Sequence, residues 1–302
     1  MDLRIFSCFL LFWSVSSCDS SEGSRRAEDA SSGSAGLLCE VSDFSGLAIT
    51  QDFLSTTALI VDLSGVALAG LRAQTCGLNL CISDVTNENG RVFTENPQTL
   101  VQPAFKYARG VDFVELAIPL PDTPRHELGV VVTARFPGLS EGQALLTGER
   151  AESSGVAVSL PVDGVALVDK ISFRDDEQLF RAVAFPVSEL GAVAGAHSFE
   201  LAFGTTPVNT TFCPPVAMSF PNVHAWPPGT QIELWIHGVS VREDYAPYGG
   251  WELTSLAVVD GSGDRIETLE GVSALSLFGL RRVSGLTDAA IEASPRDSAV
   301  DR

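Results

Sequence analysis

The chain has 302 residues, 45% of them hydrophobic and 19% charged, so it can bury a core and does not belong to the disordered class. Its length suggests about two domains. The formal net charge of −19 argues against a nucleic-acid partner, because phosphates demand a basic face, and against a peripheral protein held by anionic headgroups. We interpret the acidity as a contribution to solubility.

The N-terminus begins with a short, predominantly apolar stretch. Residues 5–15 follow Arg4 and span eleven positions, within the ~7–15 residues of the apolar centre of a signal peptide. A membrane-spanning helix needs about 20 apolar residues, so this stretch is too short for a lasting anchor. Small residues then lead to Cys18, and the chain turns polar after it. We therefore expect a cleaved signal peptide over residues 1–17.

The run Val15-Ser16-Ser17-Cys18 resembles the lipobox of bacterial lipoproteins, in which the cysteine becomes the lipidated first residue of the mature protein. The resemblance implies a membrane anchor at Cys18 made of three acyl chains, palmitate among them. Two or more chains anchor a protein stably, whereas one binds only marginally. A plain signal peptide that leaves Cys18 as a free thiol is the alternative.

The same resemblance implies a location in the cell envelope, and we expect the outer membrane. Asp19 keeps the inner membrane open, because Asp directly after the lipidated cysteine retains enterobacterial lipoproteins there, by a rule that is not general. Residues 18–36 are rich in Ser, Gly, Ala and Glu, which predicts a flexible tether.

From residue 37 onward, short apolar runs are interrupted by Gly, Pro, Asn and Asp about every eight to twelve residues, as is typical of all-β sandwiches and barrels. We expect two β-sandwich domains, at 37–136 and 150–285, and a disordered tail at 286–302. In the first domain the pattern predicts strands at 57–63, 111–118 and 128–136, with turns at 64–65 and 87–90.

Two segments of the first domain carry a family resemblance. LIVDLSGVALAGL at 59–71 and TNENGRV at 86–92 resemble a carboxypeptidase regulatory-like, or prealbumin-like, domain over about 37–136, with Asn87 where that family has Asp. The resemblance implies a small β-sandwich without catalytic residues of its own.

In the second domain we expect strands at 156–160, 198–203, 211–222, 232–237, 251–259, 265–268 and 275–280, and a turn at 260–263. Residues 175–182 predict one or two helical turns at most. The order T-x-F-x-x-P-V at 210–216 resembles bacterial adhesion-type β-sandwiches of the ZU5-like kind, and YAPYGGW at 245–251 is similar to uncharacterised bacterial lipoproteins. Neither resemblance implies an activity.

Cysteine usage agrees with an oxidising compartment. Cys8 leaves with the signal peptide, and besides Cys18 four cysteines remain, which is compatible with two disulfides. Cys76 and Cys81 flank a loop short enough for a hairpin, so we expect them to pair. Cys39 with Cys213 would follow by elimination. A zinc site is the alternative, weakened because the spacing is not C-x-x-C and no His lies close in sequence.

Few groups point to catalysis. Gly138–Gly142 matches the G-x-S-x-G string around Ser140, but a nucleophile elbow needs a strand before the serine and a helix after it. Pro137 precedes the string and no clear helical pattern follows, so we interpret it as a loop. The four histidines are scattered without metal-ligand spacing: His126, His197, His224 and His237.

Two polar turns could also be interpreted as calcium-binding loops. Asp260, Ser262 and Asp264 offer oxygens, and Asn87 and Asn89 precede Gly90, but we expect ordinary turns at both places. The densest aromatic cluster is interpreted as core, with a carbohydrate or protein contact to be considered if its rings are exposed: Trp226, Trp235, Tyr245, Tyr248 and Trp251.

These observations favour a membrane-anchored, non-enzymatic lipoprotein that binds or scaffolds an unknown protein or glycan of the envelope, with no cofactor, no metal and no nucleic acid. The alternative is an envelope serine hydrolase that uses Ser140 with His126 or His197.

Overall fold

The computed structural model describes residues 49–107, 111–170, 172–241 and 245–283, all of which belong to one compact unit. The signal peptide, Cys18, the tether, Cys39 and the tail at 286–302 lie outside the described residues. The described chain is all-β and contains no helix of seven or more residues, which confirms the expected fold class. Its short helical elements are α1 (Gly191–Ala194) and the 3-10 turns η2 (Leu139–Glu141), η3 (Asp175–Glu177) and η4 (Val187–Glu189).

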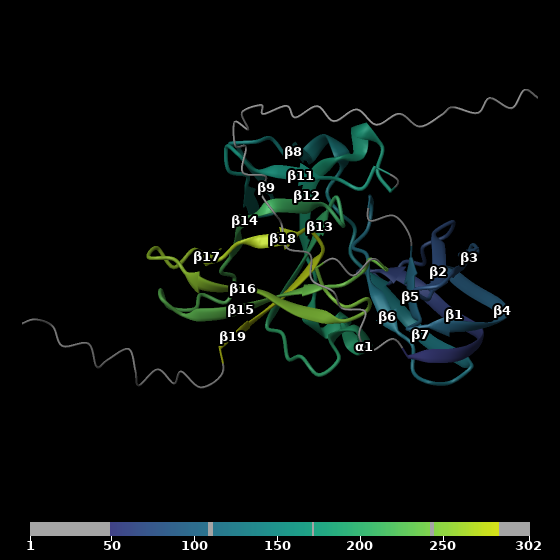
Figure 1. The fold of residues 1–302 in the computed structure, drawn as a ribbon. Coiled ribbons are helices and arrows are strands. Elements are labelled where there is room, and N and C mark those ends of the chain that lie inside the picture. Colours follow the sequence, from purple (N-terminus) through teal and green to yellow (C-terminus); the bar gives the residue numbers. More distant parts are fainter. Residues whose placement is uncertain (1–48, 108–110, 171, 242–244, 284–302) are drawn as a thin grey trace, which may run out of the picture. The chain divides into compact units, whose positions relative to one another are not determined.

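The first part of the chain folds into two small sheets (Figure 1). One has the order β4-β1-β7, where the central strand β1 (Thr50–Asp62) pairs antiparallel with β4 (Arg91–Val101) and parallel with β7 (Arg125–Thr133). The other is antiparallel, with the order β3-β2-β5-β6. Its strands are β2 (Arg72–Cys76), β3 (Cys81–Val85), β5 (Ala104–Tyr107) and β6 (Ala117–Pro119).

The side chains of β1 are compatible with its central place between β4 and β7. Its side chains from Thr50 to Phe53 alternate between exposed and buried, and its second half is rich in the β-branched and aliphatic residues that suit a packed strand. Ile60 is fully buried, and Phe53 and Ala58 are nearly so. They join a core to which both small sheets contribute, together with buried residues from beyond position 180, among them Leu190 and Trp251.

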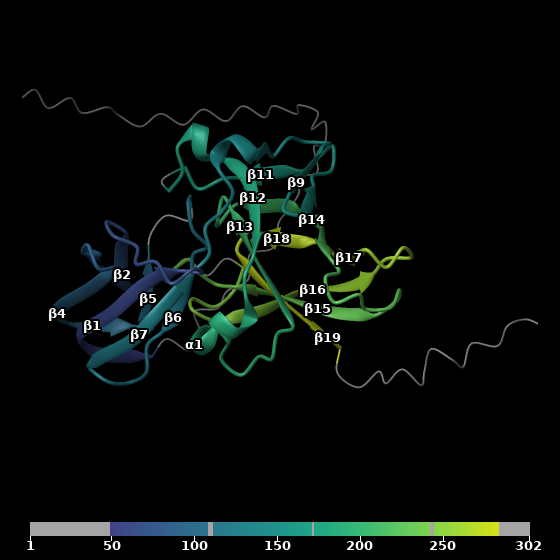
Figure 2. The ribbon, with the colours of Figure 1, turned by 180° about the vertical axis from the view of Figure 1, so that it is seen from behind.

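The remaining strands form one twelve-stranded antiparallel sheet, seen from both sides in Figures 1 and 2. Ten of them follow one path: β8 (Gln143–Ala144), β12 (Leu179–Ala184), β13 (Leu201–Thr206), β19 (Leu277–Arg282), β15 (Gln231–His237), β16 (Trp251–Val259), β17 (Arg265–Thr268), β14 (Thr211–Pro221), β10 (Val156–Ser159) and β9 (Arg150–Ser153). The short strands β11 (Val165–Leu167) and β18 (Val272–Ala274) also pair with β14.

This sheet curls so that its last strand, β9, approaches β12 and β8 near the other end of the path. The Ala182 amide donates to Ser153 Oγ at 3.0 Å, and the Glu152 amide donates to Gln143 Oε1 at 2.9 Å. The curl encloses an apolar core that includes Phe180, Phe220 and Phe278. Side-chain acceptors thus satisfy backbone groups that an open sheet edge would leave unpaired.

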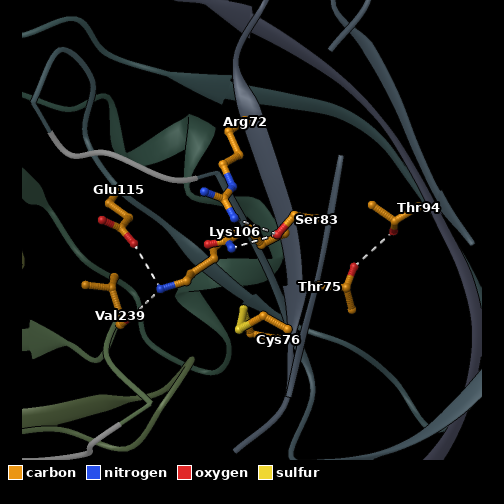
Figure 3. Close-up of a disulfide and its surroundings, with 10 residues drawn as sticks. Arg72, Thr75, Cys76, Ser83, Thr94, Lys106, Glu115 and Val239 are labelled. Atoms are coloured by element: carbon orange, nitrogen blue, oxygen red, sulfur yellow. Dashed lines mark hydrogen bonds and ion pairs between the residues drawn. A yellow bond between two sulfur atoms is a disulfide. The ribbon is translucent and has the colours of Figure 1, made fainter. Parts of the chain in front are cut away.

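The two parts share buried contacts. The Ala117 amide of β6 donates to Nε2 of His237 at the end of β15, and Lys106 Nζ of β5 reaches the carbonyl oxygen of Val239 at 3.3 Å. Lys106 also forms a buried ion pair with Glu115, at 3.3 Å, beside the disulfide of Cys76 (Figure 3). Residues of both parts belong to one buried core. These contacts define no boundary between the parts, so the division into domains at 37–136 and 150–285 stays a prediction.

Most expected strands are present, with bounds shifted by a few residues, and the strands at 251–259 and 265–268 have the expected bounds. The turns at 64–65 and 87–90 are confirmed: the Gly65 amide donates to the Asp62 carbonyl and the Gly90 amide to the Asn87 carbonyl, both glycines with positive φ. One expectation was wrong: residues 111–116 are not a strand, and only 117–119 are. Within 175–182 the limit of one or two helical turns holds, because the chain forms the single 3-10 turn η3 and then enters strand β12, where Phe180 is buried.

Candidate functional site

A pocket of about 320 Å³ opens at the C-terminal end of β12 and the start of β13. The turn between β14 and β15 also contributes to its lining. Eight of its eleven lining residues are apolar, and only Ser188, Glu200 and His224 are polar. The full lining is Ala184, Phe185, Pro186, Val187, Ser188, Glu200, Leu201, Ala202, Phe203, Val223 and His224. Its volume is at the lower end of the range of small-ligand sites.

The pocket exists because β12 stops early. The Phe185 amide donates to the Ala202 carbonyl at 2.8 Å, after which Pro186 and the 3-10 turn η4 lead the chain away from β13. Proline has no backbone N–H to donate, so it ends the ladder at this point. Leu201 and Phe203, whose side chains belong to the enclosed core, therefore also line the pocket.

The turn that contributes Val223 and His224 to the lining is held by hydrogen bonds of Asn222. Its Nδ2 donates to the carbonyl oxygens of Trp226, at 2.8 Å, and Gly263, at 2.9 Å, and its Oδ1 accepts the Trp226 amide at 3.1 Å. The turn presents Val223, which is 65% exposed, and the exposed His224 toward the pocket.

The polar rim centres on Glu200 and Arg282. Glu200 Oε1 accepts from Arg282 Nε at 3.0 Å, and Glu200 Oε2 accepts the Arg282 amide at 2.8 Å. Burial alone would raise the pKa of the Glu200 carboxyl, but hydrogen bonds and charge from Arg282 outweigh it and hold this pKa below its ordinary value. His224 Nε2 lies 3.0 Å from the Glu200 carbonyl oxygen, and the His224 ring packs on Trp226. The rim is thus internally paired, and the pocket offers mainly apolar surface to a ligand.

The other face of β19 carries a cluster of the same composition. Arg281 Nε donates to Glu233 Oε2, at 2.6 Å, and the guanidinium lies over the Trp235 ring at 5.1 Å. His197 packs on Trp235 with a centroid distance of 4.4 Å. Burial and the nearby Arg281 lower the pKa of His197. Arg281 and His197 thus both pack on the half-buried Trp235 ring.

The other aromatic rings expected in the core lie there. Trp226, Tyr245, Tyr248 and Trp251 are each at most 8% exposed, and only Trp235 is half-buried. Trp251 Nε1 donates to the Val193 carbonyl oxygen, and the ring of His237 packs on Trp251 at 4.8 Å.

The groups considered for hydrolysis are not brought together. Ser140 is exposed in the 3-10 turn η2, and the two-residue strand β8, not a helix, follows it. His126 is buried in β7 and stacks on Phe53, while His197 belongs to the cluster on Trp235. In the described ranges no hydrogen bond joins Ser140 to either histidine.

The polar turns use their oxygens internally. Asp260 Oδ1 accepts from the amides of Asp264 and Arg265 and, with Oδ2, from the Ser262 hydroxyl. The Ser262 hydrogen bond is the main reason why the pKa of Asp260 lies below its ordinary value. Asn87 Oδ1 accepts from the amides of Asn89 and Arg91 in the same way. Among the described residues, no group of three or more His, Cys, Asp or Glu side chains gathers as a metal site.

The expected hairpin disulfide is present. Cys76 and Cys81 end β2 and begin β3, and their sulfurs are bonded. Cys213 of β14 is disulfide-bonded as well. Its expected partner, Cys39, lies outside the described residues, so that pairing stays a prediction.

Comparison with family models and with curated proteins finds no match to this chain. Within the described residues, no helix is long and apolar enough to cross a membrane. The pocket had no signal in the sequence, because its lining comes from three separate segments whose residues are individually unremarkable. The Glu200–Arg282 pair, 82 positions apart, likewise has no local pattern.

Proposed function

We propose that this chain is a lipid-anchored, non-enzymatic binding protein of the bacterial cell envelope, and that its pocket receives an apolar side chain of a protein partner. The observation that supports this most is the pocket itself, an open and largely apolar space beside an internally paired rim. The lipobox-like run ending at Cys18 supports the location.

The chemistry of the lining favours a protein side chain over a glycan. Sugars are held by exposed aromatic faces and several hydrogen-bonding groups, whereas Phe185 and Phe203 are only 3% and 2% exposed. Glu200, the main charged group of the wall, is already paired with Arg282. The pocket volume of about 320 Å³ lies at the lower end of the range for ligand sites, which suits a small apolar group such as a side chain.

Site-specific photocrosslinking in intact cells tests this function. A photoreactive phenylalanine derivative at Ser188, on the pocket rim, is expected to give a discrete adduct with an envelope protein, and the same group at Gln98, exposed on β4, is not.

The decisive comparison uses two matched charge substitutions. Val223→Asp places a carboxylate in the pocket wall and is expected to abolish the Ser188 adduct. Val85→Asp, at a similarly exposed valine of β3, is expected to leave it unchanged. Equal adducts in both variants, or equal adducts from Ser188 and Gln98, would show that the pocket is not the binding site.

A further inference from the structure

The outer face of the three-stranded sheet β4-β1-β7 is apolar at its centre. β1 pairs Thr57 with Phe93 of β4, and it pairs Leu59 with Val130 of β7. Residues opposite each other on paired strands share a face, and Ala58, between the two β1 residues, belongs to the buried core. The two pairs therefore lie on the face turned away from that core. Phe93 is 50% exposed and Val130 59% exposed, so the described chain leaves both side chains open to solvent.

Charged side chains flank this centre on both outer strands. The register places Glu95 of β4 and Arg125 of β7 at the level of Ser55 on β1, one on each side. Arg91 shares the face of Glu95 because it lies four positions away on β4, and Glu127 shares the face of Arg125, two positions away on β7. All four are exposed, and in the described ranges none of them belongs to an ion pair. Each outer strand thus presents one arginine and one glutamate.

This order of charges is self-complementary under a two-fold axis that runs along β1. Such an axis lays β4 of one copy over β7 of the other, so Glu95 meets Arg125 of the second copy and, by symmetry, Arg125 meets its Glu95. Arg91 and Glu127 meet diagonally, offset by two residues or about 7 Å along the strands, which their long side chains can span. The apolar centres of the two copies then face each other, with Leu59 close to the axis.

We propose that this face is the contact surface between two copies of the chain, related by that two-fold axis. A partner of a single charge sign would meet like charges at two of the four flanking positions, whereas a second copy meets an opposite charge at each of them. The contact involves no residue of the pocket lining.

The size of the face sets the expected strength of this dimer. With about 3.3 Å for each residue over 55–61 and about 4.8 Å for each strand, the face measures roughly 20 by 14 Å. That area is well below the roughly 800 Å² that each partner buries in a standard interface. The net charge of −19 also opposes association, so the dimer should be weak and reversible.

Charge reversals at the flanking positions test the two-fold contact. Sedimentation equilibrium of the purified protein at roughly 10–300 µM measures the dissociation constant of the dimer. Glu95→Arg and Arg125→Glu each place like charges opposite one another at both symmetry-related positions, so each is expected to raise this constant at least about fivefold. In a mixture of the two variants, each copy supplies the charge that the other one lacks, and the heterodimer is expected to recover the wild-type constant. Glu267→Arg, the same change of charge at an exposed residue of β17, is the control and should have little effect.

The apolar centre is tested separately. Val130→Asp is expected to abolish the dimer, and Val85→Asp, at a similarly exposed valine of β3, to leave it unchanged. A photoreactive phenylalanine derivative at Leu59 is expected to join two copies in cells. A chain that stays monomeric over the whole concentration range would overturn the proposal, as would a mixture that fails to recover dimerisation. An adduct from Leu59 with another protein alone would also overturn it and would assign the face to that protein.

Discussion

Arg281 and Arg282 are consecutive residues of β19 that form ion pairs on opposite faces of the same sheet. Arg281 pairs with Glu233 and lies over Trp235, whereas Arg282 pairs with Glu200 and lies over Trp226. Successive side chains of a strand point to opposite faces of the sheet, so these two neighbouring arginines form one ion pair on each face, at the end of the strand. On each side a histidine packs on the same tryptophan, His197 on Trp235 and His224 on Trp226.

These two ion pairs should differ in their contribution to stability. The Arg281–Glu233 pair is the more buried, with side chains 28% and 21% exposed, whereas the Arg282 side chain is 57% exposed. We expect Glu233→Gln to lower the free energy of unfolding by about 1 kcal/mol and Glu200→Gln by less. Urea unfolding of the two variants measures this, and a larger loss for Glu200→Gln would contradict the burial argument.

Acid should destabilise the protein through His237. This ring is fully buried, its Nδ1 lies 2.8 Å from the Gly250 carbonyl oxygen, and its Nε2 lies 3.1 Å from both the amide nitrogen and the carbonyl oxygen of Ala117. Burial lowers the pKa of His237 from 6.5 to about 4. The unfolded chain therefore binds the proton more readily, so the stabilising contribution is present above pH 6.5 and is lost as the pH falls toward 4.

The difference corresponds to roughly 3 kcal/mol between pH 7 and 4. Urea titrations across this range measure it, with His237→Gln as the comparison. The variant should be less stable at pH 7 but lose clearly less stability on acidification. An unchanged pH dependence in the variant would assign the acid sensitivity to other groups.

Arg181 should be costly to replace, although no carboxylate is seen to pair with it in the described part of the chain. It is 1% exposed, and its guanidinium donates to the carbonyl oxygens of Val111, at 2.6 Å, and Pro137, at 2.9 Å. Arg181→Met keeps much of the volume but leaves both carbonyls without their donor, so we expect a loss of about 2–4 kcal/mol. Arg135→Met, at an exposed arginine over Phe113, is the control and should cost less than about 1 kcal/mol. Thermal unfolding measures both losses, and similar shifts of the unfolding temperature for the two variants would contradict a structural role of the Arg181 hydrogen bonds.

The Cys76–Cys81 disulfide closes a short loop. Its sequence separation is 5, and a loop of this size restricts the unfolded chain by about 2 kcal/mol. We expect Cys76→Ala combined with Cys81→Ala to lower stability by about that amount without loss of the hairpin. The Gly77 amide still donates to the Leu80 carbonyl, and the Asn79 side chain still bonds to Thr99 and Val101. Calorimetry without reductant measures the effect, because reductant would also open the disulfide at Cys213.

The membrane anchor is tested at Cys18. If this residue is lipidated, Cys18→Ala should move the protein from the membrane to the soluble fraction, because the acyl chains supply the attachment. Cell fractionation with detection of the protein measures this. A variant that stays with the membrane would reject lipidation at this position.

Local patterns in the sequence were sufficient for the fold class and for much of the strand layout. The turns at Gly65 and Gly90 were predictable because glycine supplies the positive φ that those turns need. The strand at 251–259 was predictable because apolar residues recur along it and turn-forming residues stand before and after it. Where prediction was wrong, at 111–116, packing outweighed local preference: Val114 and Leu116 are buried without belonging to a strand.

The sequence by itself determined that this protein is all-β, carries a hairpin disulfide at Cys76–Cys81 and builds ordinary turns at Asn87 and Asp260, because each of these depends on residues close together in the chain. Only the tertiary structure decided where the pocket lies, which arginine pairs with which glutamate, and that His237 is buried against Ala117. Those relationships join residues tens to more than a hundred positions apart, and they arise from the pairing order of strands, for which a single sequence carries no periodic signal.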